Sequence, residues 1–252
     1  MGLKLLLVDV EMFPNVGCTW GTWDQRVIKV LKRRMVCSIA WKWHGQSRRE
    51  VLALPDFPGY DPKAPWTNKA LIKTFSREVL AGADVVIGHN LVDFDDKRIN
   101  SDLFLQKLRP GAPYRMVDTL KVCRARFDLN SNKLGDVCEE LGIGKKLPHP
   151  GFPMWEGCME GDKKSWALMK RYNLHDVDPL LEGLYEHLLP WIPNHPNLSL
   201  GEMPGCPRCK HKVLKSDGSR HTNAGSYKKM LCLGCRSWCK GVVVRGKLLY
   251  RL

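Results

Sequence analysis

The chain begins with a short apolar run that ends in two acids. Residues 3–11 read Leu-Lys-Leu-Leu-Leu-Val-Asp-Val-Glu, and an apolar run of this length predicts a central strand buried on both faces. Strand side chains alternate, so Asp9 and Glu11 project from the same face at the strand's carboxyl end. Adjacent buried acids repel each other, and a divalent cation is the usual remedy. The alternative is that Asp9 caps a turn and Glu11 faces solvent.

Further along, the pattern predicts strands and helices in alternation. We predict strands at residues 35–43, 51–54, 84–88 and 115–117, and helices at residues 65–82, 97–108, 119–126, 134–141 and 162–176, with a further helical segment that ends at residue 190. The early strands follow one another as a meander, whereas the later ones are joined through helices. This order predicts an α/β domain with acids gathered at the carboxyl edge of its sheet.

Capping residues and helix breakers mark the ends of several predicted helices. Pro179 cannot donate to the helical hydrogen-bond ladder, so we expect a kink or a restart there. The stretch at 145–161 is rich in proline, glycine and histidine and is predicted to be a loop. The candidate caps are Thr67 or Asn68, Asp118, Ser131 with Asn132, Asp162 and Asp178.

More acids occur where a strand gives way to a helix. Asp93, Asp95 and Asp96 follow the strand at 84–88 and are all candidate ligands, whereas Asp93 or Asp96 could equally be a helix cap. Tyr172 and Asp176 are four residues apart on a predicted helix and therefore share one of its faces. Unlike the caps, Asp176 has no evident structural role.

An irregular, aromatic stretch follows the first strand. Residues 12–23 include Trp20 and Trp23 with Gly21 between them. Two interpretations are open. The tryptophans form a stacking surface for nucleic-acid bases, or they belong to the hydrophobic core.

Positive charge is concentrated at the end of the chain. The 252 residues carry 40 Lys and Arg against 26 Asp and Glu, a balance of +14, and can form one medium and one small domain. Residues 201–252 contain 12 basic and 2 acidic residues, or +10, whereas the remainder has 28 against 24, or +4. A basic tail on a nearly neutral body indicates a polyanionic partner, most simply nucleic acid. The alternative is a merely solubilising surface.

Neither a membrane protein nor a disulfide-stabilised secreted one is indicated. No apolar stretch approaches the length of a membrane span, and Asp9 interrupts the apolar start, so we predict no signal peptide or anchor. The ten cysteines form no framework pattern in the first 200 residues. Both features predict a cytoplasmic protein.

Four of the tail's cysteines have the spacing of a metal site. Cys206-Pro-Arg-Cys209 and Cys232-Leu-Gly-Cys235 are two knuckles with 22 residues between them. Four thiolates form a closed tetrahedral site, which predicts one structural Zn²⁺. About fifty residues hold too small a core to fold unaided, so the metal supplies folding free energy. The alternatives left open are a disulfide pair and ligation by Cys239, His211 or His221.

Basic and aromatic side chains surround these knuckles. Lys228, Lys229 and Arg236 are our candidate contacts to a phosphate backbone. We therefore predict a Cys₄ zinc-ribbon domain that binds nucleic acid at residues 199–252, after a larger domain at residues 1–198.

Three segments together resemble the exonuclease motifs of the DEDD superfamily. They follow one another in the family order, and the tyrosine is that of the tyrosine subclass. Residues 117–120, 131–134 and 189–197 are also similar to phage-encoded DnaQ-like proteins, which are described as DNA polymerase proofreading subunits. The three segments are Asp9-Val10-Glu11, Asn90-Leu91-Val92-Asp93-Phe94-Asp95 and Tyr172-Asn173-Leu174-His175-Asp176.

The resemblance implies a fold and a set of site residues. It implies a ribonuclease H-like mixed sheet flanked by helices, and two Mg²⁺ or Mn²⁺ ions held by Asp9, Glu11, Asp95 and Asp176. Tyr172 would orient the attacking water, because its ordinary pKa near 10 makes it a poor base. Met12, Asn90 and Phe94, with Trp20 and Trp23, are candidate contacts to the substrate. Met12 departs from the small hydroxyl residue of many relatives, and Pro179 interrupts a helix that is usually continuous.

The function that follows is 3′–5′ exonuclease activity on single-stranded or frayed DNA ends, releasing nucleoside 5′-monophosphates in phage DNA replication, proofreading or DNA degradation. A DNA polymerase is a candidate partner, and the location would be the host cytoplasm. Two alternatives stay open. One is a 3′–5′ exoribonuclease of the same superfamily, and the other is a nucleic-acid-binding accessory with a vestigial nuclease site.

Overall fold

The computed structural model describes residues 2–23, 26–199, 205–223, 225–244 and 247–251. Its strands are β1 Leu5–Phe13, β2 Val16–Cys18, β3 Lys29–Lys32, β4 Met35–Trp43, β5 Arg49–Ala53, β6 Val85–Gly88, β7 Arg115–Asp118, β8 Leu214–Thr222, β9 Gly225–Cys232, β10 Trp238–Val244 and β11 Lys247–Arg251. Its helices are α1 Lys69–Thr74, α2 Asp95–Leu105, α3 Thr119–Arg126, α4 Leu134–Glu140, α5 Phe152–Met159, α6 Lys163–His175 and α7 Glu182–Leu188. Short 3₁₀ or π segments are η1 Leu54–Asp56, η2 Phe75–Val79, η3 Leu80–Gly82 and η4 Asp176–Leu181.

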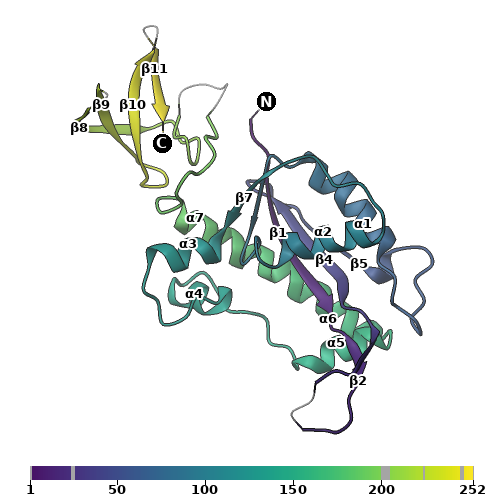
Figure 1. Ribbon diagram of the computed structural model, residues 1–252. Coiled ribbons are helices and arrows are strands. Elements are labelled where there is room, and N and C mark those ends of the chain that lie inside the picture. The colour runs from purple at the N-terminus through teal and green to yellow at the C-terminus, as the bar shows by residue number, and fades with distance from the viewer. Residues whose placement is uncertain (1, 24–25, 200–204, 224, 245–246, 252) are drawn as a thin grey trace.

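Strand β1 lies at the centre of a five-stranded sheet of order β5-β4-β1-β6-β7. It pairs antiparallel with β4 and parallel with β6, so the sheet is mixed. Helices lie on both faces of this sheet (Figure 1). This helix-flanked sheet confirms the predicted fold class, including the central place of the first strand.

Side chains alternate along β1 and enter two separate cores. Leu6 and Val8 pack in one core with apolar residues of α1, α2, α5 and α6. Leu5 and Leu7 pack in the other, with residues of α3, α4, η4 and α7. Asp9 continues the series of Leu5 and Leu7, so it lies on the face of the sheet that η4 and α7 cover.

Two elements differ from the sequence prediction. The aromatic stretch after β1 belongs to a two-stranded hairpin of β2 and β3, which is separate from the main sheet. The predicted loop at 145–161 contains helix α5. Its Met154 and Cys158 are buried in the first core, and Pro153 lies in its first turn, where the missing N–H does no harm. The burial of this short apolar face outweighs the surrounding proline and glycine residues.

The predicted helix caps are only partly correct. Asp118 and Asp162 each accept a hydrogen bond from the backbone N–H three residues on, as predicted. Asn68 precedes α1 but its buried side chain donates to the backbone of β4 instead. Within the described residues, no side-chain hydrogen bond caps α4, so the prediction for Ser131 and Asn132 is wrong.

The helical run α6–η4–α7 is interrupted beside Pro179, as predicted. Asp178 has the non-helical angles φ −143° and ψ 114°. Its carboxylate does not cap the next segment and instead accepts a hydrogen bond from Lys42 Nζ at 3.0 Å. The predicted capping role of Asp178 is therefore wrong, whereas the kink itself is present.

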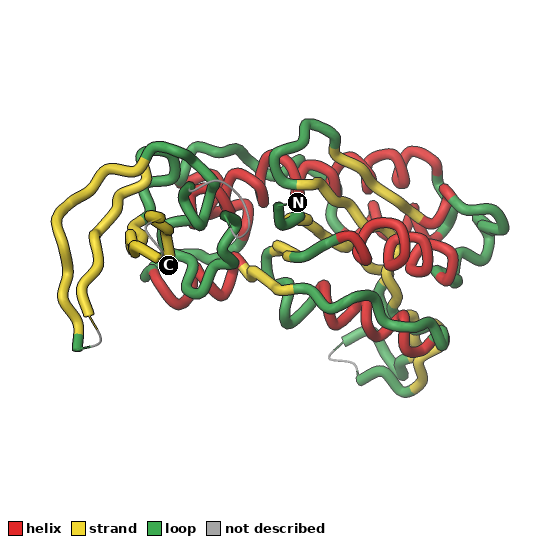
Figure 2. Tube along the Cα trace, turned by 90° about the horizontal axis from the view of Figure 1, so that it is seen from above, coloured by secondary structure: helices red, strands yellow, loops and turns green. Residues whose placement is uncertain are grey.

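The C-terminal part forms a four-stranded antiparallel sheet of order β11-β10-β9-β8. It lies at one end of the molecule, next to the end of α7 (Figures 1 and 2). The Arg208 guanidinium donates to the carbonyls of Leu189 and Ile192, at 2.6 Å each. Leu198 is buried in the second core, and its N–H donates to the Pro207 carbonyl at 2.8 Å. The tail is therefore attached to the body through specific contacts.

Candidate active site and zinc cluster

Three acids from distant parts of the sequence converge at the carboxyl end of β1. Carboxylate oxygens of Asp9, Glu11 and Asp176 all lie within 4.8 Å of one another. Asp9 and Glu11 share one face of β1, and a bulge follows directly between Glu11 and Met12. Asp176 is the first residue of η4, which packs across that face. Glu11 therefore belongs to a cluster of acids, and the alternative that it merely faces solvent is wrong.

Asp95 approaches the same strand from its other side. It is the first residue of α2, is 3% exposed, and accepts a hydrogen bond from the Val10 N–H at 3.1 Å. Its oxygens lie outside the cluster of three, but its charge acts on both Asp9 and Glu11. Three of the four predicted metal-binding acids are thus in mutual contact range, and the fourth adjoins them.

Lys146 is the only cation hydrogen-bonded to these acids among the residues that the structure describes. Its Nζ donates to Asp176 Oδ2 at 2.6 Å and to the Tyr172 hydroxyl at 2.8 Å. The other oxygen of Asp176, Oδ1, is buried and has no hydrogen-bond partner. A buried carboxylate oxygen left unpaired is costly unless a cation binds it, so this atom fits a metal ligand.

Asn173 holds the strand and the helix together behind the acids. Its fully buried amide donates to Asp9 Oδ2 at 2.6 Å and accepts from Ser38 Oγ at 2.8 Å. The sequence prediction missed both Asn173 and Lys146. Asn173 directly follows Tyr172 and could have been noted from that position, whereas Lys146 lies in a loop without any periodic signal.

Burial and mutual repulsion raise the pKa values of the acids. Burial is the largest cause for Glu11, whose pKa rises to about 8, and the neighbouring Asp176 adds to it. Burial also raises the pKa of Asp95 to about 7, against the hydrogen bond from Val10. The pKa of Asp9 is raised by burial first and by Asp176 next. The site therefore disfavours its own negative charge when no cation is bound.

Tyr172 is buried between aromatic rings. Burial, followed by the charge of Asp176, raises the pKa of its phenol to about 12. The centre of the His149 ring lies 4.8 Å from that of the Tyr172 ring, and the centre of the Trp155 ring lies 6.5 Å from it, both edge to face. Both neighbours come from the region predicted as a loop. The phenol stays protonated at neutral pH and can donate a hydrogen bond.

The turn that precedes Asp95 is shaped by backbone geometry. Gly88 ends β6, and a Cβ there would lie 2.9 Å from the Leu91 side chain, so only glycine fits. Asn90 has a left-handed φ of 69°. Asp118 accepts hydrogen bonds from the Asn90 and Val92 N–H groups at 3.1 and 3.0 Å. Asp118 therefore positions this turn in addition to capping α3.

An open cavity of about 880 Å³ adjoins the acids. Asp9 and Asp176 form part of its wall, together with Asn90. Its other charged lining residues are Arg124, Lys133, Asp136, Glu139, Lys145 and Lys146. A cavity with both acids and several cations along its wall has the chemistry to hold a phosphodiester beside metal ligands.

The remaining predicted substrate contacts differ in their surroundings. Met12 is partly buried against the first core, as is Phe94, whose ring lies 5.4 Å below the Arg98 guanidinium carbon. Trp20 and Trp23 are 90% and 87% exposed. The alternative that these tryptophans belong to the core is therefore wrong.

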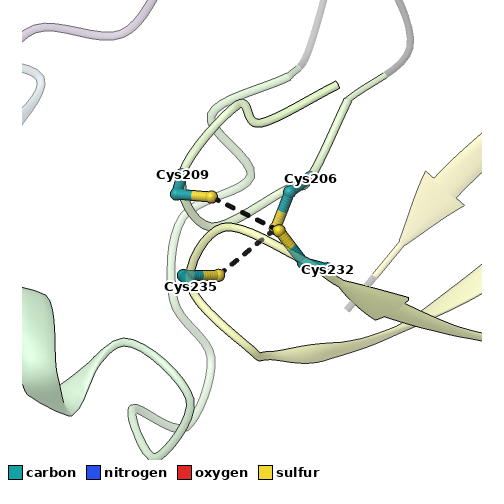
Figure 3. A group of neighbouring side chains, drawn as sticks. All are labelled: Cys206, Cys209, Cys232 and Cys235. Atoms are coloured by element: carbon teal, nitrogen blue, oxygen red, sulfur yellow. Dashed lines mark hydrogen bonds between the residues drawn. The ribbon is translucent and has the colours of Figure 1, made fainter. Parts of the chain in front are cut away.

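The four predicted zinc ligands form one cluster. The sulfurs of Cys206, Cys209, Cys232 and Cys235 all lie within 4.8 Å of one another, and they converge in Figure 3. Sulfur pairs are 3.7 Å (206 and 235) and 3.6 Å (209 and 232) apart. Zn–S bonds of about 2.3 Å in a tetrahedron require sulfurs about 3.8 Å apart. This cluster has the geometry of a structural zinc site, and Cys235 rather than Cys239 belongs to it.

Basic and aromatic side chains alternate on the tail's sheet. Lys229 Nζ lies 5.9 Å from the Trp238 ring centre, and Lys240 Nζ lies 5.3 Å from that of Tyr227. Lys229 pairs with Lys240 across the strands, so these residues share one face of the sheet. Lys228 projects from the opposite face because strand side chains alternate. Arg236 is exposed in the turn after Cys235.

Asparagine substitutions can distinguish the three neighbouring aspartates. Asp95 is buried against β1, whereas Asp93 pairs with Lys97 and Lys121 and Asp96 is hydrogen-bonded to Tyr114 and Asn100. We expect Asp95→Asn to reduce metal-dependent strand cleavage at least about a hundred-fold, and the other two variants to keep most of it. Initial cleavage rates of the three variants provide the measurement, and the reverse ranking would exclude Asp95 as the ligand.

The raised pKa values also predict how stability depends on pH. The pKa of Glu11 in the folded protein, about 8, lies above the ordinary value of 4.5. The contribution of the protonated Glu11 to folding stability is therefore complete below pH 4.5 and is lost as the pH rises to about 8. The melting temperature of zinc-loaded, Mg²⁺-free protein should therefore fall over this range. Glu11→Gln should flatten the fall, and Mg²⁺ should restore stability at the alkaline end. An identical pH profile for Glu11→Gln would refute this expectation.

Comparisons with known proteins give a match of fold. No protein-family model matches the chain, and no curated protein matches it. A solved structure, that of the family B DNA polymerase from the hyperthermophilic archaeon Pyrobaculum calidifontis, is similar over 75% of this chain, with a TM-score of 0.55 and 22% identity. The match covers 25% of the polymerase, so this chain spans about a quarter of its length. Among the described helices, none is both long and apolar enough to cross a membrane.

Proposed function

We propose that the chain is a metal-dependent 3′–5′ exonuclease that hydrolyses terminal phosphodiesters of DNA to nucleoside 5′-monophosphates. The observation that carries this proposal is the convergence of Asp9, Glu11 and Asp176, with Asp95 adjoining, beside an open cavity. A shared fold with part of a DNA polymerase supports DNA as the substrate. DNA replication, proofreading and DNA degradation are the processes that such an activity serves, with a DNA polymerase as the expected partner.

The acids fit a pair of hard divalent cations. Asp9, Glu11, Asp95 and Asp176 supply only carboxylate oxygens, which Mg²⁺ and Mn²⁺ prefer. Bound in a pair, such ions lower the pKa of water and stabilise the departing 3′-oxygen of an in-line displacement. The unpaired Oδ1 of Asp176 and the raised pKa of Glu11 both support a cationic occupant.

Tyr172 and Lys146 act as positioning groups in this proposal. The Tyr172 phenol accepts from Lys146 and keeps its own proton, so it donates to the attacking water rather than deprotonating it. Lys146 holds Asp176 by its Oδ2 and leaves Oδ1 for the metal. By resemblance to the exonuclease family, Glu11 also contacts the terminal 3′-hydroxyl, and Met12, Asn90 and Phe94 contact the terminal nucleotides.

We assign nuclease activity to residues 1–198 and a DNA-holding role to the zinc-ribbon domain at residues 199–252. The basic and aromatic face of the tail supports this division, because stacking and phosphate contacts bind single strands without sequence preference. Lys229 lies on that face, and Lys228 and Arg236 are further candidate contacts.

A product ladder tests the proposed reaction. Single-stranded DNA labelled at its 5′ end is incubated with the protein and Mg²⁺, Mn²⁺ or EDTA, and a matched RNA strand is treated in parallel. We expect stepwise shortening from the 3′ end that requires Mg²⁺ or Mn²⁺ and releases mononucleotides. A strand protected at its 3′-terminal linkage should resist.

Other outcomes select the alternatives. Faster shortening of RNA than of DNA would make the protein an exoribonuclease. Tight DNA binding without any metal-dependent shortening would make it a binding accessory. Internal cuts would exclude an exonuclease.

A further inference from the structure

The hairpin of β2 and β3 follows the acids of β1 in the chain and projects from the body of the molecule. It begins three residues after Phe13 and lies at the edge of the molecule, beyond the end of β1 (Figure 1). Its large apolar side chains are exposed, and so are Lys29, Lys32, Arg33 and Arg34. The exposed apolar residues are Trp20, Trp23, Val27, Ile28, Val30 and Leu31. This segment contributes little to the core, so its composition calls for a partner.

A cavity of about 380 Å³ lies at the base of this hairpin. Arg33 and Arg34 line it from the end of β3, and Arg98 lines it from α2. The Arg98 Nε is buried and has no hydrogen-bond partner. Arg34 and Arg98 are close enough that the charge of Arg34 lowers the pKa of Arg98, after the larger effect of burial. The positive charges of Arg34 and Arg98 are thus held close together, beside an Arg98 Nε that has no hydrogen-bond partner.

No ion pair among the described residues involves these three arginines, Arg33, Arg34 and Arg98, although the charge of Asp102 acts on Arg98. Asp102 is the acid in the cavity wall, and its Oδ2 already accepts from the Val36 N–H and the Asn68 amide. Three guanidinium groups around one acid leave an excess of positive charge, and the unpartnered Arg98 Nε is suited to a phosphate oxygen.

We propose that this arginine cavity is a phosphate subsite that holds the backbone of a DNA single strand, upstream of the end that lies at the acids. Binding of the strand does not depend on cleavage, whereas its direction, with the 3′ end at the acids, rests on the proposed exonuclease function. The occupant is a strand rather than a free anion because residues in the cavity wall lie close in the chain to the acids. Met12 in its wall directly follows Glu11, and Arg98 lies one helical turn after Asp95.

The exposed tryptophans fit the same occupant. A strand whose phosphate lies between Arg34 and Arg98 passes the hairpin, where Trp20 and Trp23 offer faces for base stacking. Stacking is tolerant of sequence, as an enzyme that trims any 3′ end requires.

Binding titrations with charge-neutral variants test the subsite. The probe is a fluorescein-labelled oligothymidylate of about twelve nucleotides, read by fluorescence anisotropy without Mg²⁺ or Mn²⁺ over a series of salt concentrations. We expect Arg34→Gln/Arg98→Gln to weaken binding about five- to ten-fold and to reduce the salt slope by about 0.7, the value for one phosphate contact. Arg34→Gln alone should have part of the effect, and its exposed side chain makes it safe for folding.

The matched control removes two arginines elsewhere. Arg48 pairs with Glu50, and Arg77 is exposed on η2, so Arg48→Gln/Arg77→Gln should bind like the wild type. Inorganic phosphate should compete only weakly, because a strand makes several contacts at once. Equal affinity and equal salt slope for Arg34→Gln/Arg98→Gln and the wild type would overturn the subsite and leave the hairpin as a protein-docking surface. If the wild-type protein showed no cleavage but the arginine variants still bound DNA more weakly, the subsite would stand and the nuclease activity would be refuted.

Discussion

Asp9→Asn and Asp176→Asn are each expected to reduce 3′–5′ hydrolysis about a thousand-fold while the protein stays folded. Asparagine keeps the size of the side chain but offers a metal ion one neutral oxygen in place of a carboxylate, which removes ligand charge where it is needed. The fold should tolerate the change, because three clustered acids repel one another in the absence of a cation. Initial rates on end-labelled DNA, together with melting temperatures, provide the measurement.

The same cavity supplies controls for this prediction. Glu139 lines it and pairs with Lys145 at 2.5 Å, outside the acid cluster. Glu139→Gln should therefore retain nearly full activity. Tyr172→Phe should lose less than either aspartate variant, because in the proposed mechanism the phenol only orients water. Aspartate variants that fold and cleave at the wild-type rate would eliminate the metal mechanism.

Cys232→Ser should release the zinc ion and weaken DNA binding about ten- to a hundred-fold. A zinc ion in the cluster would hold together two knuckles that are far apart in sequence, and the basic face of β9 and β10 adjoins them, so its loss should disturb that face. Zinc content should fall from about one ion per chain to none. The apparent Michaelis constant should rise more than turnover falls, since contacts remote from the reacting phosphate provide uniform binding. Metal analysis, DNA titration and steady-state kinetics measure these effects.

Cys239→Ser is the matched control for this second prediction. Cys239 is buried near Cys232 and Cys235 but is not part of the cluster. The Cys239→Ser variant should keep both its zinc ion and its affinity for DNA. Loss of zinc from Cys239→Ser but not from Cys235→Ser would reverse the ligand assignment. Unchanged DNA affinity in zinc-free Cys232→Ser would refute the DNA-holding role and favour a protein partner for the tail.

The central strand and the acids could be predicted because local patterns determine them. The apolar run before Asp9 is buried on both faces, and period-two alternation alone sets Asp9 and Glu11 side by side. The two-knuckle spacing likewise predicts the cysteine cluster, since the chemistry of zinc fixes the ligands. In both cases the information lies within a few residues.

Features that depend on tertiary packing could not be predicted in the same way. Helix α5 is stabilised by burying Met154 and Cys158 against distant residues, which outweighs a local composition typical of loops. Lys146 reaches Asp176 only because two distant segments meet. Asn68 has the sequence position of a cap, but its amide is drawn into a buried network with Asp102. Propensity is a weak guide wherever such contacts decide.

Under the proposed function, the helical run that carries Asp176 sets a minimum length for a substrate that also reaches the tail. Twelve residues of α-helix rise roughly 18 Å at about 1.5 Å per residue, which sets the scale of the kinked run from Asp176 to Leu188 at the end of α7. Arg208, which lies between Cys206 and Cys209 of the cysteine cluster, donates hydrogen bonds to backbone carbonyls just past that end. Under the proposed function, a stacked strand that reaches from the acids to the tail, at about 3.4 Å per nucleotide, is therefore expected to need about five nucleotides. Below this length a strand is expected to lose contact with the tail, so the proposed activity would remove each further nucleotide in a separate encounter.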